Sequence, residues 1–269
     1  MEESLNPQSI QEDQATSMVK TTKVLLMNPP FSLEKRYGKS IAKIGAVLLP
    51  LGLGYVAAVI ERAGYPIKIL DCEAENLDGE DVLQYCIKEK FDAIGVYCNT
   101  SNFNTTLTLC RQIKAALPGI KIITGGPQAT NEKTATLQND VFDFIVFGEA
   151  EETFVEILDS IEHKWDDNKK RSILGSGFKL HDTKEVIVNP SRPFIKDLDT
   201  LPFPARHLFK QDIYNPAPNQ FKKLPYGSIM ASRGCPYTCT FCNIVSIWKQ
   251  EYRIRSPDNV ISEMKHLKD

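Results

Sequence analysis

The chain has 269 residues, 42% hydrophobic and 25% charged, as is typical of a globular protein. This composition excludes a wholly disordered chain and a collagen-like or low-complexity protein. Lys and Arg number 32 and Asp and Glu 34, so the net charge of −2 gives no global attraction to nucleic acid or anionic membranes. The length allows one large domain or two modest ones.

The N-terminal residues do not resemble a secretory signal, and we expect none. Residues 1–19 contain four acidic residues and neither Lys nor Arg, so we expect residues 1–20 to be a disordered tail. The longest uncharged run, Ile44–Ile60, has 17 residues and is too short to span a bilayer. Seven cysteines without an export signal do not fit a disulfide framework, and we expect a cytoplasmic protein.

Residues 21–165 alternate short apolar runs with helical patterns. Continuous apolar runs predict strands covered on both faces, and their alternation with amphipathic helices predicts an α/β parallel sheet of Rossmann or flavodoxin type. The predicted strands are Lys23–Met27, Ile67–Leu70, Ala93–Tyr97, Ile120–Thr124 and Phe142–Phe147. The helical stripes are Leu53/Val56/Ala57/Ile60, Val82/Leu83/Cys86/Ile87, Cys110/Ile113/Leu117 and Phe154/Ile157/Leu158/Ile161. The scattered cysteines at positions 72, 86, 98 and 110 are expected in the core.

Ligands of such sheets bind at the carboxyl ends of the strands. Four predicted strands end there in loops rich in Gly, Pro, Asn, Ser or Thr, at 28–30, 99–102, 125–127 and 148–151. The segment Gly52–Ala57 matches the dinucleotide fingerprint G-x-G-x-x-A, and Asp71 follows the next strand. That fingerprint must directly follow the first strand, whereas 21 residues separate Pro30 from Gly52, so we expect no NAD site.

The pattern changes after residue 165. Seven prolines between Asn189 and Pro225 predict an extended connector, so we assign residues 166–225 to a hairpin and a linker. The hairpin is predicted at Phe178–Leu180 and Glu185–Val188, and a further strand at Gly227–Ser232. A last helix is predicted to begin at Ser256-Pro257, with Val260, Ile261, Met264 and Leu267 as its apolar stripe.

Three cysteines, Cys235, Cys239 and Cys242, form a C-x3-C-x2-C cluster. Three thiolates on one loop can converge on a metal centre, and an iron–sulfur cluster with three protein ligands leaves one iron open. Structural zinc or an inert loop are the alternatives, but zinc usually needs a fourth ligand at close spacing. Between Pro204 and Arg255, eight Lys and Arg face two Asp and Glu, which suits an anionic ligand or a solvated basic face.

The C-x3-C-x-aromatic-C loop after a predicted strand resembles the signature of the radical S-adenosylmethionine (radical SAM) superfamily. The upstream residues resemble the cobalamin-binding domain that precedes it in one large subclass. The resemblance covers nearly all of residues 21–269. The matching segments are Asn28-Pro29-Pro30, Pro50–Tyr55, Gly125-Gly126-Pro127, Gly148–Glu151, Arg192–Asp199, Leu201–Arg206 and Arg253–Val260.

This resemblance implies cofactors and site residues. Cys235, Cys239 and Cys242 would hold three irons of a [4Fe–4S] cluster, SAM would chelate the fourth iron, and Phe241 would lie near its adenine. Cleavage of SAM would give a radical that attacks a small-molecule substrate of unknown identity, with electrons from a donor such as flavodoxin or ferredoxin. Cobalamin contacts are expected at Asn28, Thr100, Ser101, Gly125, Gly126, Pro127, Gly148 and Glu149.

The chain departs from relatives of this kind in three respects. The D-x-H-x-x-G motif is absent after the first strand, and Gln128 replaces a frequent histidine, so bound cobalamin would lack a histidine ligand. Only 27 residues follow Cys242, whereas a partial (β/α)6 barrel needs roughly 200. We therefore expect the N-terminal portion of a cobalamin-dependent radical SAM enzyme, methyltransferase-like, whose barrel starts within residues 226–269. A cobalamin carrier without catalysis, or an iron–sulfur or zinc protein unrelated to SAM, are the alternatives.

Overall fold

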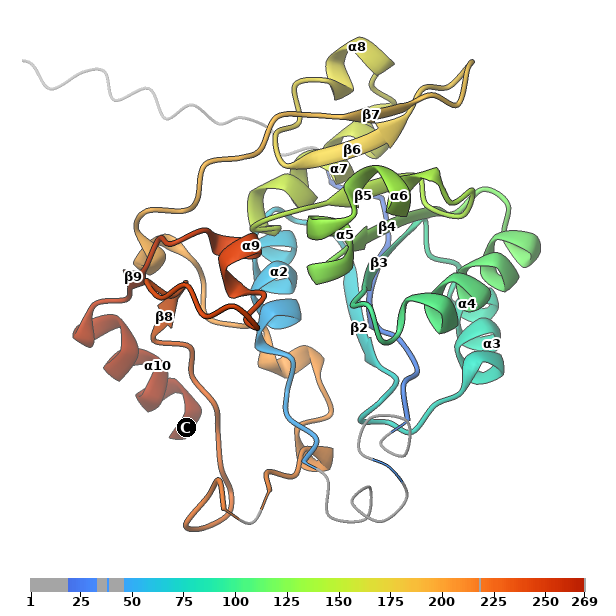
Figure 1. Ribbon diagram of the computed structural model, residues 1–269. Coiled ribbons are helices and arrows are strands. Elements are labelled where there is room, and N and C mark those ends of the chain that lie inside the picture. Colours follow the sequence, from blue (N-terminus) through green and yellow to red (C-terminus); the bar gives the residue numbers. More distant parts are fainter. Residues whose placement is uncertain (1–18, 33–37, 39–45, 218, 269) are drawn as a thin grey trace, which may run out of the picture.

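The computed structural model describes residues 19–32, 38, 46–217 and 219–268 (Figure 1). Residues 1–18 of the predicted tail lie outside this part. Lys20 is held by the body of the protein, because its Nζ pairs with Asp159 at 2.5 Å. Within the described residues, no helix combines the length and the apolar character needed to cross a membrane.

A seven-stranded sheet in the order β2-β1-β3-β4-β5-β6-β7 forms the centre of the protein (Figure 1). The first five strands run parallel, and they are β1 (Val24–Asn28), β2 (Ile67–Asp71), β3 (Ala93–Tyr97), β4 (Lys121–Gly125) and β5 (Phe144–Val146). All five predicted strands are present, with ends that differ by at most two residues. The order 2-1-3-4-5 is the flavodoxin-like one, and the predicted fold class is confirmed.

Helices cover both faces of this sheet (Figure 1). On one face lie α2 (Leu51–Arg62) and α7 (Glu151–Glu162), and on the other lie α3 (Gly79–Glu89) and α4 (Phe103–Ala116). Successive side chains of a strand point to opposite faces, so Leu25 and Met27 pack toward α3 and α4, whereas Val24 and Leu26 pack toward α2 and α7.

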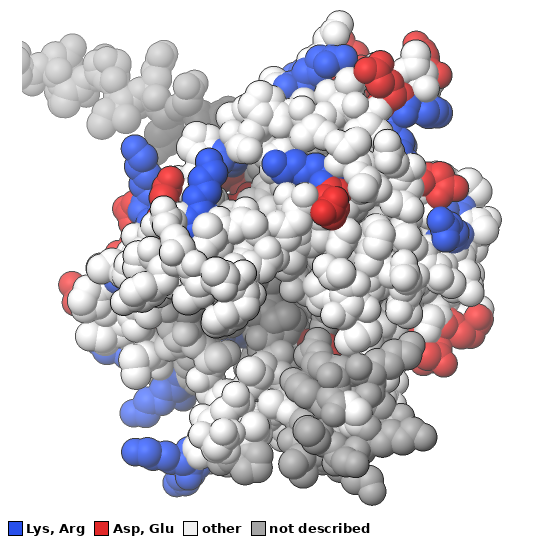
Figure 2. Space-filling model, viewed as in Figure 1, with Lys and Arg blue, Asp and Glu red and all other residues white. Residues whose placement is uncertain are grey.

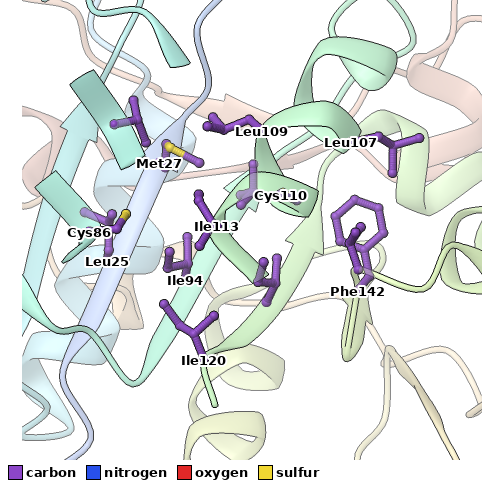
Figure 3. Packing of buried hydrophobic residues seen from close by; sticks show 14 of the residues in the cluster. Leu25, Met27, Cys86, Ile94, Leu107, Leu109, Cys110, Ile113, Ile120 and Phe142 are labelled. Atoms are coloured by element: carbon purple, nitrogen blue, oxygen red, sulfur yellow. The ribbon is translucent and has the colours of Figure 1, made fainter. Parts of the chain in front are cut away.

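The core between the sheet, α3 and α4 contains three of the four scattered cysteines, Cys72, Cys86 and Cys110, and Figure 3 labels the last two; Cys98 is buried as well, so all four are inside, as predicted. Each is at most 1% exposed and none forms a disulfide. Burial raises the pKa of the Cys86 and Cys98 thiols to about 11. These thiols are therefore protonated at neutral pH and serve as apolar core groups.

Two short helices between β4 and β5 were not predicted from the apolar patterns. They are α5 (Pro127–Asn131) and α6 (Lys133–Gln138). The first begins directly after Gly126, with Pro127 in its first turn, where the missing N–H of proline costs nothing. As a result, β4 turns into a helix at the carboxyl edge of the sheet.

The predicted hairpin is confirmed as β6 (Ser176–Lys179) and β7 (Val186–Val188), which pair antiparallel after the short helix α8 (Asp167–Lys170). It belongs to the main sheet, because β6 also pairs antiparallel with β5. The sequence pattern indicated the hairpin but not its position as an edge extension of the sheet.

The connector that follows contains three short 3-10 turns, η1 (Leu198–Thr200), η2 (Arg206–Leu208) and η3 (Gln211–Ile213). It packs closely on α2. Ala205 donates a backbone hydrogen bond to the Gly54 carbonyl at 3.0 Å, and a Cβ on Gly54 would lie 3.0 Å from the Cβ of Pro204. The glycine at position 54 thus permits the close packing of the connector against α2.

The C-terminal part lies beside α2 and consists of β8 (Ser232–Arg233), α9 (Ile244–Trp248), β9 (Arg253–Ile254) and α10 (Pro257–Lys268) (Figure 1). The predicted strand Gly227–Ser232 is wrong over residues 227–231, which are not in a strand. A strand needs a hydrogen-bonded neighbour, and β8 pairs with β9 only from Ser232 onward.

The last helix begins where it was predicted. The Ser256 hydroxyl accepts a hydrogen bond from the Asn259 N–H at 3.1 Å, which is the expected N-cap contact. The predicted apolar stripe is partly right: Val260 and Leu267 are half-buried, but the other two members are exposed. Ile261 and Met264 are 47% and 57% exposed, whereas Glu263 is fully buried against arginines from other elements.

Candidate functional site

A cavity of about 460 Å³ lies at the carboxyl ends of β1, β3, β4 and β5. Its volume is within the roughly 300–1,000 Å³ of small-molecule and cofactor sites. Its place is also the expected one, since β1 and β3 form the switch point of a 2-1-3-4-5 sheet. Walls come from α2 through Leu53 and Val56, and from the C-terminal part through Met230, Ile247 and Trp248.

Two glycines shape the sheet side of this cavity. Gly126 has a φ of +100°, and a Cβ on it would lie 2.7 Å from the Cys98 carbonyl oxygen and 2.9 Å from the Tyr97 ring. Gly148 has a φ of +76° and no atom within 4 Å of a Cβ position, so space is open beside its backbone. Both positions require glycine and expose main chain to a ligand.

Six of the eight residues predicted to contact cobalamin line the cavity: Asn28, Gly125, Gly126, Pro127, Gly148 and Glu149. Thr100 and Ser101 are not part of the lining. Instead, the Thr100 hydroxyl donates a hydrogen bond to the Gln128 Oε1 at 3.1 Å. Sequence analysis missed Ile247 and Trp248, which lie about a hundred residues further along the chain and reach the cavity only through tertiary packing. No local pattern marks them.

The Asp71 carboxylate forms hydrogen bonds inside the fold. Its carboxylate accepts hydrogen bonds from the Asn28 amide at 2.8 Å and from the Tyr214 hydroxyl at 3.0 Å. Burial raises the pKa of this carboxyl group, and the hydrogen bonds from Asn28 and Tyr214 oppose that rise. In a dinucleotide site this residue would have to face a ribose, whereas here it joins the sheet to the connector.

The cysteine loop connects β8 to α9. Cys235 and Cys242 are partly buried and Cys239 is exposed, and none forms a disulfide. The backbone N–H of Cys242 bonds to the Cys239 carbonyl at 3.0 Å, which makes a tight turn between two of the three thiols. Among the residues that the structure describes, no three His, Cys, Asp or Glu side chains are grouped so that they could hold a metal ion. The cluster-binding role of the three cysteines thus stays a prediction.

Two residues shape the cysteine loop and its surroundings. Gly234 has a φ of +83°, and a Cβ on it would lie 1.8 Å from the Glu251 carbonyl oxygen, so only glycine fits where the loop leaves β8. Phe241, predicted to lie near adenine, is 91% exposed. An aromatic ring this exposed beside the thiols is accessible for stacking on a flat ligand.

A buried ion-pair group joins the start of the cysteine loop to the end of β5. The Glu149 carboxylate accepts hydrogen bonds from Arg233 at 2.9 Å, Arg253 at 2.8 Å and the Ile195 N–H at 2.8 Å. Glu151 accepts a further one from Arg233 at 2.5 Å. Burial alone would raise the pKa of Glu149, but the bonds from the two arginines outweigh it and hold that pKa below its usual range.

A second group of buried ion pairs lies against α10. Glu263 pairs with Arg206 at 2.5 Å and also with Arg255, which donates a hydrogen bond to the Tyr55 hydroxyl at 3.2 Å. Four of the eight cationic side chains between Pro204 and Arg255 are thus in buried ion pairs. The local positive charge is therefore partly neutralised by acidic residues from elsewhere.

The exposed charges are mostly at the margins of the face shown in Figure 2, which carries α5 and α9. The centre of that face is formed mainly by uncharged residues (Figure 2). An uncharged surface around a largely apolar cavity suits a neutral, extended ligand better than a polyanion.

The flavodoxin-like sheet and the cavity at its switch point define an α/β ligand-binding domain. Residues 39–158 match the B12 binding domain family. The chain is 31% identical over 93% of its length to an uncharacterized methyltransferase of Pyrococcus horikoshii, and 29% identical over 92% to a cytidylyl-2-hydroxyethylphosphonate methyltransferase of Streptomyces wedmorensis. The family match assigns a B12 binding domain to residues 39–158, and the chain is similar over most of its length to proteins named as methyltransferases.

These relatives are longer than the chain. It spans 51% and 52% of the two methyltransferases. A solved structure of the radical SAM methyltransferase TsrM from Kitasatospora setae, with cobalamin and a [4Fe–4S] cluster bound, superposes with a TM-score of 0.64 at 17% identity. That match covers 92% of this chain and 46% of TsrM, and it shows that the fold is shared.

Proposed function

We propose that the chain is the cofactor-binding N-terminal part of a cobalamin-dependent radical SAM methyltransferase. It would place cobalamin at the carboxyl edge of the sheet and a [4Fe–4S] cluster on the cysteine loop. We assign residues 21–165 to the cobalamin-binding domain and residues 226–269 to the start of the radical SAM domain. A small-molecule substrate, a flavodoxin or ferredoxin as electron donor, and a cytoplasmic location belong to this proposal.

One observation carries it: a single cavity is lined from both assigned domains. Gly126 and Gly148 come from the ends of β4 and β5, while Arg233 lies two residues before Cys235, and Trp248 six after Cys242. A ligand in this cavity would therefore lie next to the cysteine loop, as two cofactors of one reaction require.

The cavity fits the chemistry of a corrinoid. Its walls are mainly apolar, which suits the faces of a macrocycle, and the strand ends offer backbone groups and the Asn28 amide to peripheral amide groups. The described lining contains no histidine, so histidine is not among the cobalamin contacts that we propose. Asn28, Gly125, Gly126, Pro127, Gly148 and the backbone and hydrocarbon groups of Glu149 are the contacts we propose.

The cysteine loop fits an iron–sulfur cluster by its donor set. Cys235, Cys239 and Cys242 would each provide one thiolate and leave one iron for SAM, with Phe241 beside the adenine. The cluster and SAM supply radical chemistry, and cobalamin supplies a transferable methyl group. The residues of this chain bind and orient these groups, and α9 covers the cavity where they meet.

Anaerobic reconstitution tests the proposal. The protein is incubated with iron, sulfide and hydroxocobalamin, desalted, and analysed for metals and for visible absorbance. We expect both cofactors on the wild-type protein. A Cys239→Ala variant should lose the iron and keep the cobalamin, and a Thr240→Ala variant in the same loop should keep both.

Other results would support the alternatives. Stoichiometric zinc in place of iron would overturn the radical SAM assignment. Bound cobalamin without any cluster would favour a carrier module, because that outcome needs only the sheet, α2 and the loops at the strand ends.

A further inference from the structure

The buried carboxylate of Glu149 lies between the two proposed cofactor sites. It belongs to the Gly148–Glu151 loop at the end of β5, and it is also part of the cavity wall. Its two oxygens bind Arg233 at 2.9 Å and Arg253 at 2.8 Å. These arginines belong to β8 and β9, the two strands that enclose the cysteine loop and α9. One carboxylate thus holds both ends of the segment that carries the three thiols.

This arrangement leaves little freedom for the loop. The side chains of Glu149 and Arg233 are 5% and 6% exposed. Arg233 is also fixed by Glu151 at 2.5 Å and lies over the Tyr55 ring, 5.1 Å from its centroid. Arginine binds two carboxylates through separate Nη atoms, which fixes its orientation as well as its distance.

The stability of the fold does not by itself explain why Glu149, Arg233 and Arg253 form buried ion pairs. Replacing a buried ion pair by apolar residues is often neutral or stabilising, so such a pair is weak evidence of a role in folding. Its clearest use is to fix one arrangement among several. Here the arrangement that is fixed is that of the cysteine loop relative to the sheet edge, 82 and 84 residues away along the chain.

We propose that Glu149, through Arg233 and Arg253, is a positioning residue that sets the distance between the cluster loop and the cobalamin cavity. This inference rests on the function proposed above. Glu149 itself does not take part in chemistry. Both oxygens of its carboxylate already accept hydrogen bonds, from the two arginines and from the Ile195 N–H at 2.8 Å, so we expect a ligand in the cavity to meet its hydrocarbon and backbone groups.

Magnetic coupling between the cofactors tests this role without a substrate. Reduced [4Fe–4S] clusters and cob(II)alamin are both paramagnetic, and their dipolar coupling depends steeply on distance. The experiment uses the reconstituted, fully loaded protein and measures the coupling by pulsed electron paramagnetic resonance. Glu149→Gln keeps the shape of the side chain and removes its charge. Glu156→Gln is the control. It removes the charge of a carboxylate that pairs with Arg192 at 2.5 Å, and this ion pair does not involve the cysteine loop.

We expect a single, narrow coupling in the wild-type protein and in Glu156→Gln. In Glu149→Gln the coupling should shift to weaker values and broaden, while the iron and cobalt contents stay at wild-type levels. An unchanged coupling in Glu149→Gln, or an equal change in Glu156→Gln, would overturn the positioning role.

Different results would contradict the proposed function and the positioning role of Glu149. If the wild-type protein binds no cluster or no cobalamin, the proposed function fails. If Glu149→Gln does not fold, Arg253→Lys replaces it, because this variant keeps the charge but removes the guanidinium that binds Glu149 from β9. A wild-type coupling in Arg253→Lys would then contradict the proposal, and a shifted one would support it.

Discussion

Tyr214 of the connector donates a hydrogen bond to Asp71 at the end of β2, at 3.0 Å, although the two residues are 143 positions apart. Asp71 is only 3% exposed, and its other carboxylate oxygen is bound by Asn28 on β1. The connector is therefore anchored to the same edge of the sheet that opens into the cavity.

The Tyr214→Phe variant tests this anchor. Removal of the hydroxyl leaves a buried carboxylate oxygen without that partner, which costs about 1–3 kcal/mol. We expect the free energy of unfolding, measured with urea, to fall by this amount. Tyr237→Phe is the control, because Tyr237 is 71% exposed, and it should change the stability little. Equal stabilities of the two variants would contradict the account.

Gly126→Ala tests the turn at the end of β4. The φ of +100° and the Cys98 oxygen at 2.7 Å leave no room for a methyl group. We expect a loss of about 1–3 kcal/mol in stability from overpacking and strain, together with weaker cobalamin binding in a spectroscopic titration. Gly119→Ala is the matched control, since no atom lies within 4 Å of its Cβ position. Wild-type affinity in Gly126→Ala would exclude this turn from the binding site.

Glu263→Gln tests how α10 is attached. The carboxylate is fully buried between Arg206 and Arg255, and loss of one partner of a buried pair costs about 3–5 kcal/mol because the other charges stay unpaired. We expect faster hydrogen exchange across residues 257–268. Asp258→Asn makes the same charge change at an exposed position of this helix and should leave the exchange nearly unchanged. Slow exchange in Glu263→Gln would show that apolar contacts hold the helix.

Glu162 gives a prediction for pH. Its carboxylate accepts hydrogen bonds from the backbone N–H groups of Thr21 and Thr22 at 3.1 and 2.8 Å, and from both threonine hydroxyls. Burial alone would raise the pKa of Glu162, but these hydrogen bonds outweigh it and lower that pKa from 4.5 to about 2. The folded pKa is below the unfolded one, so the stabilisation is complete above about pH 4.5 and is lost as the pH falls toward 2.

The measurement compares stability against pH in the wild-type protein and in Glu162→Gln. The difference in unfolding free energy between the two should be constant near neutral pH and should shrink below about pH 4.5. Glu185→Gln, which makes the same change at an exposed position, is the control. A constant difference for Glu162→Gln down to acidic pH would contradict the assignment.

The sequence predicted the strands of the sheet well and the C-terminal part, from β8 to α10, poorly, and both outcomes have physical reasons. Strands such as Ala93–Tyr97 are covered on both faces, so burial makes them continuous apolar runs that are visible locally. The face of α10 could not be predicted, because Glu263 is buried by Arg206 and Arg255 and not by apolar contacts. An apolar stripe indicates the buried face only where no such ion pair competes.

The same reasoning applies to the cavity. Gly126 and Gly148 were predicted at the site because glycine at the carboxyl end of a strand is a local signal. Arg233 and Trp248 were not, since their contribution depends on how the cysteine loop packs against a sheet edge that is distant in sequence. Arg233 could have been suspected from its place directly before Gly234 and the first cysteine.

The central claim is that cobalamin and an iron–sulfur cluster meet at one cavity of this protein. Anomalous X-ray diffraction at the iron, cobalt and zinc edges, from crystals of the reconstituted protein, tests it most directly. We expect an iron signal at Cys235, Cys239 and Cys242, and a separate cobalt signal within the cavity near Gly126 and Gly148. A zinc signal at the cysteines, or cobalt bound away from this cavity, would contradict it.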